Sequence, residues 1–131
     1  MFSTNIRVRY KETDKGGRVY HSNYFVWLDM TRTEFLRSLG ISYAKLEEEG
    51  IFIVVRKAEM EYLSSAEFDK EYTIRIDSFK TNKIKLDFYY SILDNITEDI
   101  IAKAFTQLVI VNKQGKPIKI PNHLKEKLTN F

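Results

Sequence analysis

The chain has 131 residues, and its 44% hydrophobic and 14% aromatic content suits a folded domain with a core rather than a disordered chain. It contains no cysteine, which excludes disulfides, thiolate metal sites and a cysteine nucleophile. The formal net charge of +3 comes from mixed signs without a basic block or a long apolar run, so we expect a cytoplasmic protein with no membrane span and no nucleic-acid partner.

The N-terminal segment has the pattern of a half-buried strand. Apolar residues alternate with two arginines from Ile6 to Tyr10, so a first strand is expected there. Residues 11–21 are predicted to form a loop, which turns at the glycine pair Gly16 and Gly17.

A long helix is expected next, from Asn23 to Leu39. Its apolar residues recur at helical spacing and form so broad a stripe that the helix should be buried on most sides. Ser22 is the expected N-cap, and Gly40 stands where a glycine would stop the helix. A second, short helix is predicted over Tyr43–Glu49.

After Gly50 the period of the apolar residues changes from that of a helix to that of a strand. The expected strands cover residues 51–62, 72–76, 84–92 and 100–111. The last of these is apolar on both faces in places, which is typical of an interior strand. Asp94-Asn95 marks the turn before it, and a terminal helix is expected over Asn122–Leu128. This order predicts a single α+β domain over residues 1–131, with an antiparallel sheet of about five strands wrapped around the long helix.

The loop and the helix start hold the residues that indicate chemistry. Asp14 precedes the glycine pair, and a helix beginning at Ser22-Asn23 exposes backbone N–H groups. A thiolate leaving group, with a pKa near 8.5 as in free cysteine, needs little help from an acid, so one carboxylate and one set of donors suffice to hydrolyse a thioester. Asp14 can attack the carbonyl carbon or deprotonate a water molecule, and the sequence leaves both open. The rival carboxylates are Glu12, at the expected end of the first strand, and Asp29 and Glu34, inside the helix.

The segment YKETDKGGRVYHSNY, residues 10–24, resembles the signature of the 4-hydroxybenzoyl-CoA thioesterase family. It is more closely similar to the small bacterial acyl-CoA thioesterases of that family that act with the Tol-Pal system. Arg18 departs from the pattern, because the family usually has Val or Ile there. The likeness extends from Ile6 to Leu128, although Ser65 replaces a proline of the family. The matching residues of the signature are Thr13-Asp14, Gly16-Gly17, Val19-Tyr20-His21 and Asn23-Tyr24.

The resemblance implies the hotdog fold and hydrolysis of an acyl-CoA thioester without a metal or another cofactor. It implies catalytic roles for Asp14 and His21, with the backbone N–H of His21 as the best candidate donor to the carbonyl oxygen. The imidazole of His21 is then a substrate donor or a residue that merely begins the helix. It also implies a homodimer or homotetramer whose sites lie at subunit interfaces. The residues expected to contact the substrate are Gly17, Val19, Tyr20, Asn23 and Tyr24.

A second interpretation is a non-catalytic hotdog module that binds acyl-CoA or an acyl-carrier protein. The lysines near the C-terminus would suit the acidic surface of such a carrier. Release of free thiol from acyl-CoA separates this interpretation from the first. A hydratase is less favoured, because His21 and His123 lie far apart in the sequence and form no acid/base pair. The same separation argues against a metal site.

Overall fold

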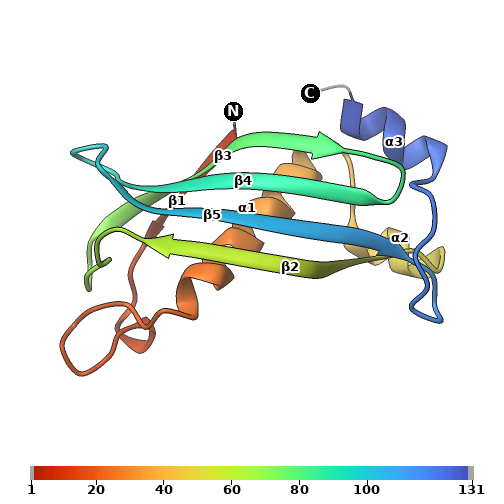
Figure 1. Ribbon diagram of the computed structural model, residues 1–131. Helices are drawn as coiled ribbons and strands as arrows, with labels where there is room; N and C mark the ends of the chain where they lie inside the picture. Colours follow the sequence, from red (N-terminus) through yellow and green to blue (C-terminus); the bar gives the residue numbers. More distant parts are fainter. Residues whose placement is uncertain (1, 130–131) are drawn as a thin grey trace.

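Five antiparallel strands form one sheet, and the long helix α1 (Asn23–Ser38) lies across one face of it (Figure 1). The computed structural model describes residues 2–129. The order across the sheet is β1-β3-β4-β5-β2, which leaves β1 and β2 at the edges and β5 inside, as predicted. The α+β architecture is therefore confirmed. The strands are β1 (Phe2–Arg7), β2 (Phe52–Tyr62), β3 (Glu71–Thr81), β4 (Lys85–Asp94) and β5 (Ile100–Val111).

The core lies between α1 and the sheet. Alternate residues of β4, such as Phe88 and Ile92, point toward the helix and are fully buried. The helix meets them with Trp27, Leu28 and Leu36, each about 1% exposed. Burial of one such large side chain contributes roughly 1.5–3 kcal/mol, so this layer fixes the position of α1 on the sheet. The start of α1 is therefore held in a fixed position relative to the sheet.

The first strand is shorter than its alternation predicts. Strand β1 ends at Arg7, and Tyr10–Glu12 form one turn of 3₁₀ helix, η1, in which Tyr10 is 79% exposed. The carboxylate of Glu12 accepts the Arg9 N–H at 2.7 Å, and this bond turns the chain away from the sheet. The predicted extension of the strand to Tyr10 is therefore wrong. The apolar alternation does continue to Tyr10, but the bond from the Arg9 N–H to the Glu12 carboxylate bends this segment into the 3₁₀ turn.

The helix boundaries follow the cap residues. Gly40 has φ of +80°, and the Ile41 N–H donates to the Leu36 carbonyl at 2.9 Å, which closes the end of α1 as predicted. The shorter helices are α2 (Tyr43–Glu48) and α3 (Asn122–Thr129), close to their predicted ranges. Within residues 2–129, no helix is long and apolar enough to cross a membrane.

One face of α1 remains uncovered in the single chain. Val26 is 45% exposed and Met30 is 50% exposed on the helix, although the apolar stripe predicts burial on most sides. The reason is that one sheet covers only one face of a helix. The prediction of near-complete burial is therefore wrong for the single chain.

Candidate active site

Residues 13–19 form a narrow loop that projects from the body of the chain beside the start of α1 (Figure 1). The two ends of the loop pair in an antiparallel bridge, and the Asp14 N–H donates to the Arg18 carbonyl at 2.7 Å. Gly17 makes the turn with φ of +79°, a conformation that favours glycine. The predicted turn at the glycine pair is confirmed.

The loop holds the exposed carboxylate of Asp14 in one orientation. Oδ1 accepts the Gly16 N–H at 2.8 Å and the Arg18 N–H at 3.2 Å. Within residues 2–129, Oδ2 meets no donor. One oxygen therefore fixes the side chain and the other is available to a substrate or a water molecule.

The buried carboxylate of Glu12 anchors this loop to α1. Glu12 is 4% exposed, and its two oxygens accept the Arg9 N–H at 2.7 Å and the Trp27 indole N–H at 2.9 Å. Its backbone carbonyl accepts the Tyr20 N–H and the Asn23 side-chain amide, both at 2.9 Å. Burial raises the pKa of Glu12, but the bonds from Arg9 and Trp27 outweigh it and hold that pKa below its ordinary value. Glu12 is an ionised anchor and not a rival base.

The start of α1 presents unengaged backbone donors. Ser22 occupies the N-cap position, as predicted, but its side chain accepts no hydrogen bond from the first turn of the helix. In the part of the chain that the structure describes, the N–H groups of His21, Ser22 and Tyr24 meet no acceptor. The His21 carbonyl accepts the hydroxyl of Tyr62, from the end of β2, at 2.9 Å. Donors at the positive end of a helix can polarise a carbonyl oxygen.

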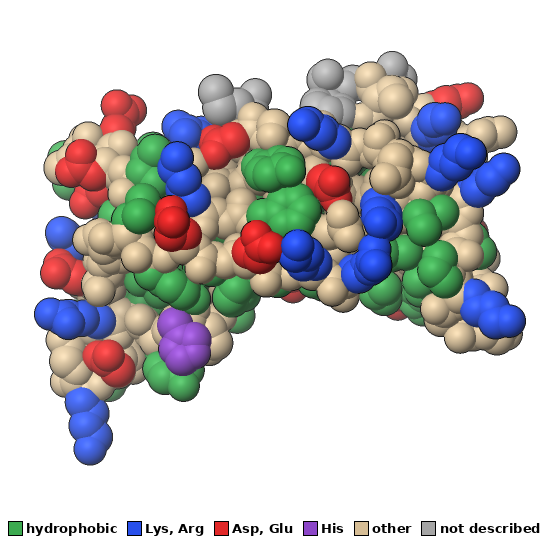
Figure 2. Space-filling model, in the orientation of Figure 1, with side chains coloured by type: hydrophobic (Ala, Val, Ile, Leu, Met, Phe, Trp, Pro, Cys, Tyr) green, Lys and Arg blue, Asp and Glu red, His purple; other side chains and the backbone are tan. Residues whose placement is uncertain are grey.

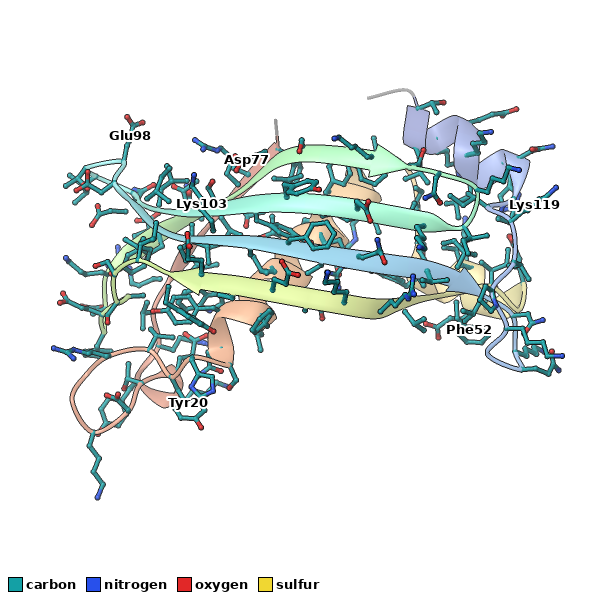
Figure 3. All side chains as sticks on the ribbon, in the orientation of Figure 1. Tyr20, Phe52, Asp77, Glu98, Lys103 and Lys119 are labelled. Atoms are coloured by element: carbon teal, nitrogen blue, oxygen red, sulfur yellow. The ribbon has the colours of Figure 1, made fainter. Side chains whose placement is uncertain are left out.

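The other residues expected at the site divide between core and surface. Val19 is 7% exposed and Tyr24 is 2% exposed, so both are packed in the core of this chain. Tyr20 is 53% exposed beside the loop (Figure 3), and its ring centre lies 4.4 Å from that of His21. The imidazole of His21 is itself exposed. The side chain of Asn23 faces inward to the Glu12 carbonyl. The loop and the helix start are thus brought together, as the motif predicts.

Two further candidates lie outside this cluster. Glu34 pairs with Arg37 on the exposed side of α1. His123 pairs with Glu49, with 3.3 Å between Nε2 and Oε2. It lies on α3, which is at the other end of the sheet from the start of α1 (Figure 1). Among the described residues, no three His, Asp or Glu side chains converge as a metal site would require.

A cavity of about 370 Å³ opens between α1 and the edge strand β2. The polar part of its lining is formed by Asp29, Arg32 and Thr106. Arg32 is 4% exposed, pairs with Asp29, and donates to the Tyr90 hydroxyl at 3.4 Å. Pockets that bury part of a small ligand commonly combine apolar walls with a few polar groups. The apolar walls are Phe25, Val26, Leu28, Val55 and Ala58.

Comparison with known proteins places this geometry in a family. Residues 8–128 match the thioesterase-like superfamily. A relative from Aquifex aeolicus, provisionally named an esterase, is 36% identical over 123 residues, which cover 93% of each chain. A relative from Escherichia coli O6:H1, named an acyl-CoA thioester hydrolase, is 31% identical over 125 residues, covering 95% of this chain and 92% of the relative.

A solved structure supports the same placement. The crystal structure of a hypothetical protein from Aquifex aeolicus aligns with a TM-score of 0.90 and 32% identity, covering 98% of this chain and 99% of the other. The five-stranded antiparallel sheet with its helix is the arrangement of the hotdog thioesterases. The predicted hotdog fold is confirmed.

Proposed function

The chain belongs to the thioesterase-like superfamily, and we propose that it is an enzyme that hydrolyses acyl-CoA thioesters to a free acid and CoA. The name of the Escherichia coli relative, an acyl-CoA thioester hydrolase, supports this activity. The signature in residues 10–24 supports a closer place in the 4-hydroxybenzoyl-CoA thioesterase family, among the small bacterial enzymes that act with the Tol-Pal system.

The observations that carry the proposal are the carboxylate of Asp14, which is fixed through one oxygen and open at the other, and the unengaged N–H donors of the helix start to which its loop leads. The thioester oxygen accepts from these N–H groups, of which His21 supplies the first. The open oxygen of Asp14 then attacks the carbonyl carbon, or takes a proton from the water that does so. The carbon–sulfur bond breaks and the thiolate of CoA leaves; its low basicity makes a general acid unnecessary. If Asp14 is the attacking group, the acyl group is then bonded to it as a mixed anhydride, and a water molecule hydrolyses this anhydride to the free acid and restores Asp14. In this scheme His21 acts through its backbone.

The acyl group is assigned to the cavity between α1 and β2. Its volume of about 370 Å³ and its apolar walls suit an acyl chain or ring, and its mouth lies along an unpaired strand edge. Val54 and Val55 on that edge are 42% and 50% exposed. We therefore include in the proposal a homodimer that pairs β2 with the β2 of a second copy and closes the cavity. Pairing of such dimers through the exposed face of α1 would give a tetramer.

The carrier of the acyl group is assigned from charge. Lysines gather over α3 and the adjoining end of the sheet (Figure 2). This surface suits the phosphates of CoA, and an acyl-carrier protein is the alternative acyl donor of the same sign. The lysines are Lys83, Lys119 and Lys125.

The test is Asp14→Asn, compared with Asp94→Asn. Asp94 is a matched control because its Oδ1 also accepts two backbone N–H groups, from Ile96 at 2.8 Å and Thr97 at 3.0 Å, in a hairpin away from the site. Each substitution keeps an oxygen acceptor and removes a charge. We expect Asp14→Asn to lower kcat for acyl-CoA by roughly 10²-fold or more, with a smaller change in KM.

Thiol release measured with a disulfide reagent checks this expectation. Asp94→Asn should retain parental activity. An Asp14→Asn protein that folds normally and turns over at the parental rate would remove Asp14 from the mechanism. Binding of acyl-CoA without thiol release by the unmodified protein would favour the non-catalytic hotdog module instead.

A further inference from the structure

Two consecutive peptide groups at the helix start are each held by their carbonyl oxygens. The Tyr20 carbonyl accepts the Asn23 N–H at 3.0 Å, which fixes the peptide that carries the N–H of His21. The His21 carbonyl accepts the Tyr62 hydroxyl at 2.9 Å, which fixes the peptide that carries the N–H of Ser22. The first of these bonds is part of the turn itself. The second comes from a strand 41 positions away in the sequence.

The position of Tyr62 is set by packed neighbours. Its ring meets the ring of Tyr24 edge to face, with 5.0 Å between centroids and an interplanar angle of 83°. Tyr24 is 2% exposed, and its hydroxyl accepts the Ala66 N–H at 2.9 Å, so it cannot turn freely. Burial raises the pKa of Tyr62, with a smaller contribution from Tyr24, so the hydroxyl remains a donor throughout the neutral range. Packing against the buried Tyr24 therefore keeps the Tyr62 hydroxyl directed at the His21 carbonyl.

From this arrangement we propose that Tyr62 is a positioning residue that holds the oxyanion donors of the thioesterase site. The inference rests on the proposed function. A peptide group is planar and trans, so a bond that holds the His21 carbonyl also directs the Ser22 N–H to the opposite side. It fixes ψ of His21 as well, and with it the angle between the N–H groups of His21 and Ser22. A bond accepted at the carbonyl further polarises the same peptide and strengthens its N–H as a donor.

The competing explanation is that this bond only fastens β2 to the loop. A hydrogen bond of a half-exposed tyrosine contributes modestly to stability, which would not alter the chemical step. The two roles differ in what they change. A fastening bond affects the free energy of unfolding, whereas a positioning bond affects kcat and the polarisation of the bound carbonyl, with little effect on KM.

The test compares Tyr62→Phe with Tyr89→Phe. The two tyrosines are similarly exposed, at 42% and 39%, and each packs against an aromatic ring. Within residues 2–129 the Tyr89 hydroxyl meets no hydrogen-bond partner, and it lies on the sheet face away from α1, opposite Phe105. Both variants keep the ring and lose only a hydroxyl. Steady-state hydrolysis of acyl-CoA and melting temperature are measured for both.

We expect Tyr62→Phe to lower kcat about tenfold, with KM changed by less than about twofold and a melting temperature only slightly below that of Tyr89→Phe, because Tyr62→Phe loses one hydrogen bond. This is less than the roughly 10²- to 10³-fold cost of deleting an oxyanion donor, because the donors remain but are less well aligned. As a second readout, the infrared carbonyl stretch of a bound acyl-CoA ketone, with CH₂ in place of the thioester sulfur, should lie at lower frequency on the parent than on Tyr62→Phe.

Equal kcat for the two variants would overturn the proposal. So would an unchanged carbonyl stretch, a change confined to KM, or a loss of activity that follows a large fall in melting temperature, since the last would assign the hydroxyl to folding. Failure of the proposed function is visible separately, because the unmodified protein would then release no thiol from acyl-CoA.

Discussion

Glu12 lies two residues before Asp14, yet its carboxylate is closed to substrate because both oxygens already accept N–H groups inside the protein. Glu12→Gln tests this anchoring role. Glutamine keeps one oxygen but places an NH₂ group against either the Arg9 N–H or the Trp27 indole N–H, so one buried donor loses its acceptor. We expect the free energy of unfolding to fall by about 1–3 kcal/mol. Urea unfolding measures it, and the exposed Glu34→Gln should change it by less than about 0.5 kcal/mol.

The depressed pKa of Glu12 gives this comparison a pH dependence. The folded-state pKa lies below the unfolded value near 4.5, so ionised Glu12 stabilises the folded state above that value. This stabilisation is lost as the pH falls through the folded pKa. The difference in unfolding free energy between the parent and Glu12→Gln should therefore be constant from pH 7 to about 5 and shrink below about 4.5. A difference that stays constant down to pH 3 would contradict an ionised anchor.

The sequence indicates a candidate for the reactive residue, but it does not indicate the bonds that support that residue. Asp14 is proposed from a contiguous motif, which can be read from one sequence without knowledge of the packing. The supporting bonds join Glu12 to Trp27 and His21 to Tyr62, which are 15 and 41 positions apart. Such pairs depend on how strands and helix pack, and no local pattern marks them. The one local signal was the separation of three between Arg9 and Glu12, which is that of a capping box.

At the scale of elements, the loop that carries Asp14 depends on a left-handed residue. Gly17→Ala and Gly115→Ala form a matched pair, because both glycines have φ of +79° and an added Cβ would meet nothing within 4 Å at either. Each substitution should cost about 1 kcal/mol of stability through backbone strain alone. Only Gly17→Ala should also lower kcat, by roughly tenfold, because it reshapes the loop that fixes the Asp14 carboxylate. Thermal unfolding and acyl-CoA hydrolysis measure the two effects.

Equal activity of the two glycine variants would show that the exact shape of the loop is unimportant to the reaction.

The ends of the elements could be predicted where a local residue sets them, and could not where a distant contact does. The end of α1 was predictable because Gly40 is a local signal, whereas the end of β1 was not, because the carboxylate of Glu12 overrides an alternation that continues to Tyr10. Local propensity decides a boundary where no tertiary bond competes with it.

At the scale of the whole molecule, the periodicity predicted an apolar surface on α1 larger than one sheet can cover. Val26 and Met30 are the part of this α1 surface that stays exposed, and Val54 and Val55 are apolar residues exposed on the edge strand β2. The spacing of apolar residues predicts that a surface is buried, but it does not show whether the same chain, a second copy or another protein covers that surface. The proposed dimer accounts for the residues at the β2 edge.

Val55→Lys tests that dimer, with Ile96→Lys as its control. Val55 lines the cavity on the unpaired edge strand, so a lysine there would bury a charge in the proposed interface at a cost of several kcal/mol. Ile96, 89% exposed in the hairpin between β4 and β5, offers the same change of chemistry away from the edge. Light scattering at micromolar concentration should give a mass of at least twice 15.5 kDa, the mass of one chain, for the parent and for Ile96→Lys. It should give the mass of one chain for Val55→Lys.

Hydrolysis of acyl-CoA should fall when the dimer is lost, because the cavity needs the second copy to close it. A parent mass of 15.5 kDa at every concentration would exclude the dimer, and an active monomeric Val55→Lys would place the complete site within one chain.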